Sequence, residues 1–181
     1  WTRKYIPKTT IDIHGQDAAV IAIKNFISSF KTNPKTSSET KKENKENKKN
    51  KGNKKAMLLH GPPGNGKTST VHAVSNELDL EILEINASDF RNEDQINSVL
   101  GNSSMQKSLF FKQKLLLIAE LDGISGKEDR GGVSAIQDLI EKTNYPVIIT
   151  ANNAYDQKFN SIRKKTLMCE FVPLTYTIVY D

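Results

Sequence analysis

The sequence contains a single cysteine, Cys169, among its 181 residues. One cysteine cannot form an internal disulfide, so the sequence excludes a disulfide-stabilised scaffold and favours an intracellular location. The histidines His14, His60 and His72 are far apart in sequence, and no Cys/His spacing typical of a metal site occurs. No apolar run approaches the roughly 18 residues of a membrane-spanning helix, and no signal peptide is visible, so we expect no membrane partner.

Apolar residues are also scarce, at 36% of the chain, and one segment explains much of this. Residues 31–55 contain ten Lys, three Glu and no aliphatic or aromatic side chain, which gives a net charge of +7. Such a segment cannot bury enough apolar surface to offset the entropy lost on ordering, so we predict a disordered Lys/Asn-rich insertion. The rest of the chain has 16 basic and 18 acidic residues, so the chain's basic character comes from the insertion.

Outside the insertion, apolar periodicity predicts strands that alternate with helices. Helices are predicted at residues 17–30, 67–78, 93–100, 132–143 and about 156–165. Strands are predicted at residues 56–60, 81–86, 114–120, 146–152 and 167–172. This alternation implies an α/β fold in which helices cover both faces of a parallel sheet. The chain then divides into an N-terminal segment 1–30, the insertion 31–55, a core 56–174 and a short C-terminal segment 175–181.

Residues 61–68 read GPPGNGKT and fit the pattern G-x-x-x-x-G-K-[ST] between a predicted strand and a predicted helix. Glycines in such a loop allow successive backbone N–H groups to turn toward phosphate, and the helix adds its positive N-terminal dipole. We expect Lys67 to reach the β- and γ-phosphates of a nucleotide and the Thr68 hydroxyl to bind Mg²⁺. The predicted nucleotide contacts of this loop are Gly61, Pro62, Pro63, Gly64, Asn65, Gly66, Lys67, Thr68 and Ser69.

The predicted strand near residue 115 ends in the carboxylates of Glu120 and Asp122. In P-loop enzymes an acidic residue at the end of a neighbouring strand helps to hold Mg²⁺. Strand alternation places Asp122 with Glu120 and opposite to Ala119, roughly 10 Å away along the chain. We therefore expect Ala119 to face the Mg²⁺ region across from Thr68 and Glu120 to lie on the other side of the strand. Ala119 has no carboxylate for the metal, and we expect that Asp122 does not supply one in its place.

The chain resembles the nucleotide-binding domain of AAA+ clamp loaders, most of all the archaeal-type large subunit of replication factor C. The resemblance rests on "KYIPKTTIDIHGQ" (4–16), "LLHGPPGNGKTS" (58–69), "EINASD" (84–89), "ELDGISGKEDRGGV" (120–133) and "VIITANN" (147–153). It implies a P-loop NTPase fold of three αβα layers with a five-stranded parallel sheet. It also implies ATP and Mg²⁺ as cofactors.

The resemblance implies roles for residues outside the loop. Glu120 matches the glutamate that orients or deprotonates the attacking water, and Asn152 matches the sensor-1 asparagine. Tyr5, Ile13 and Gly15 match the segment that lines the adenine pocket, although core packing explains Tyr5 and Ile13 equally well. The implied partners are the small clamp-loader subunits in a hetero-oligomer, expected to be a pentamer, together with a PCNA-like sliding clamp and primer–template DNA. The location would be cytoplasmic in an archaeon and nuclear in a eukaryote.

Three departures from the family pattern leave alternatives open. Ala119 stands where the family has the metal-side Asp, Ile6 replaces an arginine, and residues 164–166 read KKT where small subunits have Ser-Arg-Cys. The chain begins at Trp1 and stops where a helical lid would follow, so we expect a partial module without lid and collar. It is then a clamp-loader ATPase domain with hydrolysis weakened at Ala119, a nucleotide-binding regulatory subunit that does not hydrolyse, or another DNA-linked AAA+ ATPase such as a branch-migration motor.

Overall fold

A computed structural model describes residues 7–31, 54–88, 113–124 and 130–174 of the chain. The helices are α1 (Asp17–Lys31), α2 (Lys67–Glu77), α4 (Arg130–Lys142) and α5 (Asn160–Lys165). The strands are β1 (Ala56–His60), β2 (Glu81–Asn86), β3 (Lys114–Ala119), β4 (Val147–Ala151) and β5 (Thr166–Glu170). Short 3₁₀ helices are η1 (Thr10–Asp12), η3 (Leu121–Gly123) and η5 (Gln157–Phe159). The predicted helix at 93–100 lies outside the described residues.

The five strands form one parallel sheet in the order β2-β3-β4-β1-β5. The three central strands are buried along their whole length, which is why their sequences are nearly continuous apolar runs rather than alternating patterns. The edge strand β5 instead mixes buried and exposed residues. The predicted α/β architecture with a five-stranded parallel sheet is therefore confirmed.

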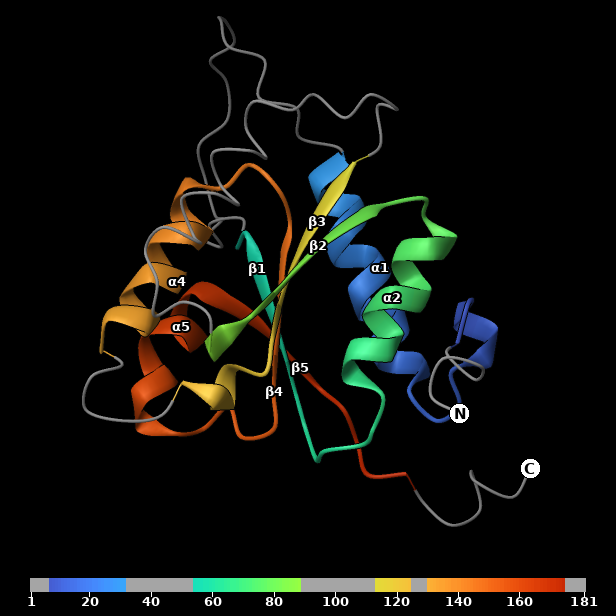
Figure 1. Ribbon diagram of the computed structural model, residues 1–181. Helices are drawn as coiled ribbons and strands as arrows, with labels where there is room; N and C mark the ends of the chain where they lie inside the picture. Colours follow the sequence, from blue (N-terminus) through green and yellow to red (C-terminus); the bar gives the residue numbers. More distant parts are fainter. Residues whose placement is uncertain (1–6, 32–53, 89–112, 125–129, 175–181) are drawn as a thin grey trace, which may run out of the picture.

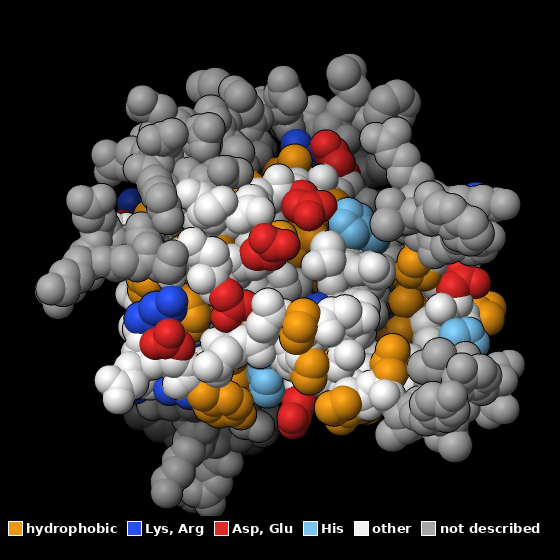
Figure 2. All heavy atoms as spheres, turned by 60° about the horizontal axis from the view of Figure 1, so that its bottom comes forward, with side chains coloured by type: hydrophobic (Ala, Val, Ile, Leu, Met, Phe, Trp, Pro, Cys, Tyr) orange, Lys and Arg blue, Asp and Glu red, His pale blue; other side chains and the backbone are white. Residues whose placement is uncertain are grey.

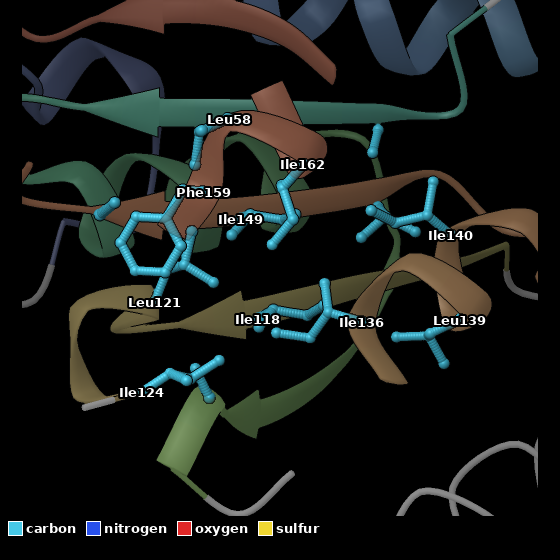
Figure 3. Close-up of a cluster of buried hydrophobic side chains, with 14 of the residues drawn as sticks. Leu58, Ile118, Leu121, Ile124, Ile136, Leu139, Ile140, Ile149, Phe159 and Ile162 are labelled. Atoms are coloured by element: carbon cyan, nitrogen blue, oxygen red, sulfur yellow. The ribbon is translucent and has the colours of Figure 1, made fainter. Parts of the chain in front are cut away.

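Helices cover the sheet on both faces, with α1 and α2 on one side and α4 and α5 on the other (Figure 1). Each face has its own hydrophobic core. The side chains Ile118, Ile136, Ile149 and Phe159 belong to the core under α4 and α5 (Figure 3). The opposite core includes the following side chains from α1, α2 and the sheet: Ala19, Ile23, Phe26, Ile27, Val71, Val74, Leu115, Leu117 and Ile148. Alternate residues of β3 thus serve opposite cores, as expected for a strand covered on both faces.

Both ends of the predicted insertion are part of the described structure. Lys31 is the last residue of α1. The Lys54 ammonium donates to the carbonyl oxygen of Thr166 at 2.7 Å, and the Lys55 ammonium donates to the carbonyl oxygens of Glu141 and Thr143 at 2.8 and 3.2 Å. Assigning Lys54 and Lys55 to a disordered segment was therefore wrong, because composition does not reveal such long-range bonds to backbone carbonyls. Residues 32–53 lie outside the described residues.

The carboxyl ends of the parallel strands meet at one edge of the sheet, which is the lower edge in Figure 1. Figure 2 brings this edge forward and shows acidic side chains spread across it. In open parallel sheets ligands bind outside the carboxyl ends of the strands, so this edge is where a site is expected. Within the described ranges, no helix is long and apolar enough to cross a membrane.

Candidate functional site

The connection between β1 and α2 carries the glycine-rich motif. Its three glycines have positive φ angles, +149° at Gly61, +81° at Gly64 and +79° at Gly66. Glycine adopts such angles without the cost that a Cβ atom imposes. Gly66 is the N-cap of α2, which begins at Lys67. Because the first N–H groups of a helix have no acceptor within the helix, the start of α2 offers them to an anion.

The Lys67 side chain is buried where the motif meets the sheet, with 8% of its surface exposed. Its ammonium donates to the carbonyl oxygens of Gly61 and Pro62, both at 2.8 Å, and to Oδ1 of Asn152 at 3.0 Å. Burial lowers the pKa of the Lys67 ammonium from its ordinary value, while the negative charge of Asp122 acts in the opposite direction. Lys67 thus links the motif to the end of β4.

Glu120 lies directly after β3 and is in the left-handed region, with φ 55° and ψ 55°. A non-glycine residue rarely adopts this conformation, and such strain is found preferentially at functional sites. The Glu120 N–H donates to Oγ1 of Thr150 at 3.2 Å, and the Gly123 N–H donates to the Glu120 carbonyl at 2.8 Å. These bonds turn the chain out of the strand and into η3.

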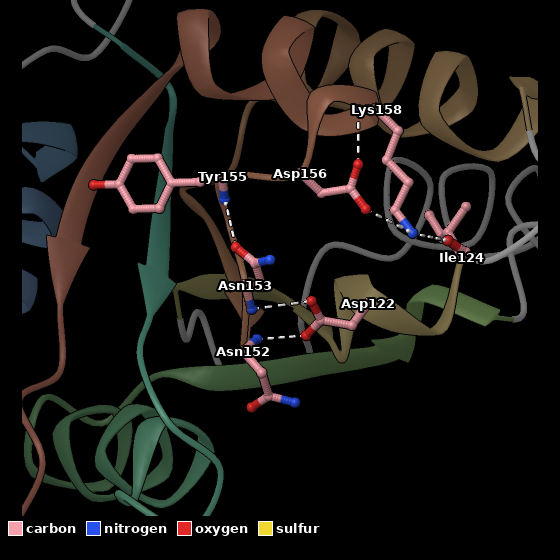
Figure 4. A network of polar contacts seen from close by, with 7 residues as sticks. All are labelled: Asp122, Ile124, Asn152, Asn153, Tyr155, Asp156 and Lys158. Carbon is pink, nitrogen blue, oxygen red and sulfur yellow. Dashed lines mark hydrogen bonds and ion pairs between the residues drawn. The ribbon is translucent and has the colours of Figure 1, made fainter.

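The Asp122 carboxylate, in η3, bonds to the residues that follow β4 (Figure 4). Its Oδ2 accepts the N–H of Asn152, and its Oδ1 accepts the N–H of Asn153 at 3.1 Å. The Asn153 Oδ1 in turn accepts the N–H of Tyr155 at 3.0 Å and closes the next turn. The segment after β3 is therefore joined to the segment after β4 by a side chain rather than by strand pairing.

These elements surround a cavity of about 320 Å³. It is lined by Pro63, Gly64, Gly66, Lys67, Thr68, Ser69, Glu120, Asp122, Thr150, Ala151 and Asn152. Most predicted residues of the loop and both residues with implied catalytic roles, Glu120 and Asn152, are thus brought together. Gly61 and Pro62 are not among the lining residues, and their carbonyl oxygens accept from the Lys67 ammonium.

The donor set of this cavity matches a nucleotide phosphate chain with Mg²⁺. Lys67 and the N–H groups at the start of α2 are donors for phosphate oxygens, and the Thr68 hydroxyl is an oxygen ligand for a hard cation. Among the described residues, no three His, Cys, Asp or Glu side chains come together that could hold a metal ion by themselves. Mg²⁺ here would therefore depend mainly on phosphate oxygens and the Thr68 hydroxyl, because each oxygen of Asp122 already accepts a backbone N–H.

Of the predicted adenine-side residues that the structure describes, neither Ile13 nor Gly15 lines this cavity. Tyr5 lies outside the described residues. Ile13 packs against the hydrophobic core under α1 and α2, which agrees with the packing alternative. Gly15 has a φ of +72°. Asn65, one of the predicted loop contacts, donates from Nδ2 to the Val172 carbonyl at 2.8 Å and so ties the loop to the chain after β5.

Ala119 ends β3 and is buried, with 7% of its surface exposed. Alternation places it on the same face as Leu115 and Leu117, which pack in the core under α2. Ala119 is not among the residues that line the cavity with Thr68, so its expected position facing the Mg²⁺ region stays a prediction. The expected position of Glu120 on the other side of the strand is wrong, because the left-handed turn at Glu120 ends the alternation and brings its side chain to the same cavity as Thr68.

Two residues of the site were not predicted as site residues: Asp122 was considered only as a metal ligand and set aside, and Thr150 was overlooked. Asp122 lines the cavity and organises the residues after β4, and Thr150 accepts the Glu120 N–H. Thr150 could have been noticed as the polar residue near the end of an otherwise apolar strand. For Asp122 the signal was an acidic residue beside Gly123, which marks a turn rather than a continuing strand.

Comparison with known proteins identifies the family of this fold. Residues 57–173 match the family model described as "ATPase family associated with various cellular activities (AAA)". The chain belongs to the AAA family. The matched range includes the glycine-rich motif, all of β2 to β5 and the cavity between them.

The chain is similar to the large subunit of archaeal replication factor C. It is 42% identical to the protein named "Replication factor C large subunit" from Nanoarchaeum equitans over 178 residues, which cover 98% of this chain and 37% of that protein. It is 42% identical to the protein of the same name from Staphylothermus marinus over 176 residues, covering 97% of this chain and 37% of that protein. The chain thus spans little more than a third of the length of these relatives.

A solved structure shares the fold at low sequence identity. The chain aligns with C. elegans PCH-2 with a TM-score of 0.60 and 15% identity, over 86% of this chain and 42% of that one. At this identity the likeness concerns the fold alone. It supports the three-layer arrangement that the sheet order and the two cores define.

Proposed function

We propose that this AAA domain binds ATP with Mg²⁺ in the cavity between the glycine-rich motif and the ends of β3 and β4. The observation that carries the proposal is the convergence of Lys67, Glu120 and Asn152, from three separate elements, on one cavity beside the start of α2. Lys67 and the α2 N–H groups would hold the phosphates, and Thr68 would contribute to Mg²⁺ binding.

We further propose that the domain is part of a clamp-loader large subunit, which helps to load a sliding clamp onto primer–template DNA. The similarity to replication factor C large subunits over nearly the whole chain supports this assignment. Its partners would be the small subunits of a hetero-oligomer, expected to be a pentamer, and a PCNA-like clamp. Such a replication role would place the protein inside the cell, in the cytoplasm of an archaeon or the nucleus of a eukaryote.

Hydrolysis would depend on Glu120, whose exposed carboxylate at the cavity can orient or deprotonate a water molecule. Asn152 would contact the terminal phosphate through the side chain that now accepts from Lys67. Mg²⁺, when bound, would neutralise charge on the phosphate oxygens. Ala119 supplies no carboxylate, so we propose that hydrolysis is weaker than in a family member with Asp at this position.

The nucleotide site is tested by Lys67→Ala with Lys24→Ala as a matched control. Lys24 is also half-buried and bonded, to Thr10 at 3.1 Å and Glu77 at 2.7 Å, but it lies on α1 away from the cavity. Each bond from an ammonium to a charged partner contributes about 1.5–3 kcal/mol, so Lys67→Ala should lower ATP affinity by about 100-fold or more.

Binding of a fluorescent ATP analogue and thermal unfolding should be measured on the parent chain and both variants. We expect Lys67→Ala to remain folded but to lose measurable ATP binding. Lys24→Ala should bind ATP with the affinity of the parent chain. If Lys67→Ala binds ATP as tightly as the parent, the proposed site is wrong.

A second candidate function is a nucleotide-binding regulatory subunit that does not hydrolyse ATP, and the observation that favours it is Ala119. The two candidates differ in ATP turnover of the full-length protein assembled with its partner subunits and a clamp. Turnover that disappears with Glu120→Gln supports the ATPase, and ATP binding without turnover supports the regulatory subunit. Another DNA-linked AAA+ ATPase would bind ATP but would not co-purify with a clamp.

A further inference from the structure

The two N–H groups bound by Asp122 lie just beyond the last paired residue of β4. Pairing between β1 and β4 ends at His60 and Ala151, so Asn152 is the first residue past this ladder. Both carboxylate oxygens of Asp122 are used, one for the N–H of Asn152 and one for that of Asn153. The backbone after β4 therefore depends on a side chain from η3 for its position (Figure 4).

The orientation of the Asn152 side chain follows from this backbone. Its Oδ1 accepts from the Lys67 ammonium at 3.0 Å, so the bonds run from η3 through the end of β4 to the start of α2. A backbone N–H bonded to a carboxylate is a charge-assisted and therefore strong hydrogen bond. Two such bonds on consecutive residues fix both the position and the rotation of the peptide that carries Asn152.

We infer that Asp122 is a positioning residue that holds Asn152 in place beside Lys67, so that recognition of a terminal phosphate by Asn152 depends on Asp122. This inference rests on the proposed nucleotide site. Asp122 acts through Asn152, because each of its two oxygens accepts one of the two N–H groups. It should therefore affect discrimination between ATP and ADP more than it affects binding of either nucleotide through the β-phosphate.

The test uses the full chain with Asp122→Asn and Asp122→Ala, and Asp156→Asn as the control. Asn keeps the size of Asp122 and one acceptor oxygen, but places an NH₂ group against one of the two N–H groups. Asp156 likewise accepts a backbone N–H, that of Lys158 at 3.1 Å, but it does not line the cavity. Circular dichroism and urea unfolding establish that each variant is folded.

The first measurement is amide hydrogen exchange by NMR, which needs no nucleotide. We expect the Asn152 and Asn153 amides to exchange about tenfold faster or more in Asp122→Ala, with a smaller increase in Asp122→Asn and none in Asp156→Asn. Unchanged exchange at both amides in Asp122→Ala would overturn the inference.

The second measurement is the ratio of ATP to ADP affinity. We expect Asp122→Asn to lower this ratio by about tenfold. In an Asn152→Ala background it should cause no further decrease, because the effects of two substitutions that remove the same contact are not additive. The inference would be overturned if the Asn152 and Asn153 amides exchanged faster but the ATP-to-ADP affinity ratio did not change. It would also be overturned if the effects of Asp122→Asn and Asn152→Ala on that ratio were additive. Either result would leave the proposed nucleotide site intact. A parent chain that binds neither nucleotide would overturn the proposed function itself, and the inference with it.

Discussion

Gly61 is the position where a single added methyl group should have the largest effect on the fold around the site. A Cβ atom on Gly61 would lie 2.2 Å from the carbonyl oxygen of Phe171, far inside van der Waals contact. Phe171 cannot simply move away, because its N–H donates to the carbonyl of His60 at 2.7 Å. Both partners are backbone, so relief would require separating the start of the motif from the chain after β5.

The cost of Gly61→Ala has two parts. A side chain at φ +149° costs on the order of 1–3 kcal/mol in backbone strain. Overpacking of a tight contact costs about 1–3 kcal/mol more, and the smaller entropy of the unfolded alanine chain returns about 0.4–1 kcal/mol. We therefore expect the free energy of unfolding to fall by about 1–5.6 kcal/mol, against the roughly 5–15 kcal/mol of a typical domain.

Gly64→Ala is the matched control in the same motif. Gly64 also has a positive φ, +81°, but a Cβ atom there would meet no atom within 4 Å. Backbone strain of about 1–2 kcal/mol applies without overpacking, and the same entropy return of about 0.4–1 kcal/mol offsets part of it, so we expect a loss of about 0–1.6 kcal/mol. Urea denaturation of both variants at equal protein concentration measures the difference. If Gly61→Ala loses no more stability than Gly64→Ala, the close approach of Phe171 does not constrain the motif.

The remaining predictions concern the metal side of the site and the insertion. In the proposed clamp-loader subunit, at full length and assembled with its proposed partners, Ala119→Asp should raise Mg²⁺-dependent ATP hydrolysis by about tenfold or more. ATP affinity should change less, because Lys67 and the loop N–H groups would hold the phosphates. Equal steady-state rates at limiting Mg²⁺ would show that the metal is held adequately without this carboxylate. Replacing residues 32–53 by a short Gly/Ser linker should leave ATP affinity unchanged and at most weaken the salt dependence of DNA binding, since only charge is removed. A large loss of ATP affinity would contradict that expectation.

The sequence predicted the framework well because the framework depends on local patterns. Buried parallel strands must be continuous apolar runs, and the predicted range 56–60 coincides with β1 while 114–120 exceeds β3 by one residue. The glycine-rich motif was equally readable, since its spacing carries a backbone requirement that other residues meet poorly. The end of α2 at Glu77 was likewise within one residue of its predicted bound.

The sequence did not predict how the ends of β3 and β4 are joined. Alternation of side chains is a rule for extended backbone, and it ceases to apply at Glu120, where the chain turns with a positive φ. The bonds from Asp122 to Asn152 and Asn153 span 30 and 31 residues of sequence, and no local pattern announces a contact at that separation. For the same reason the bond from Lys54 to the Thr166 carbonyl of β5 was not expected from a lysine-rich segment.

The turn at Glu120 also determines how an alanine at position 119 would affect metal binding and water activation. Because the chain leaves the strand there, Glu120 and Asp122 both reach the cavity, and Ala119 alone stays within the buried end of β3. Asp122 already binds two backbone N–H groups, so moving it onto a metal ion would release the residues that position Asn152. Glu120 is exposed and is the carboxylate suited to a water molecule. We propose that the alanine weakens support for the metal ion while it leaves in place the groups that would hold phosphate and activate water.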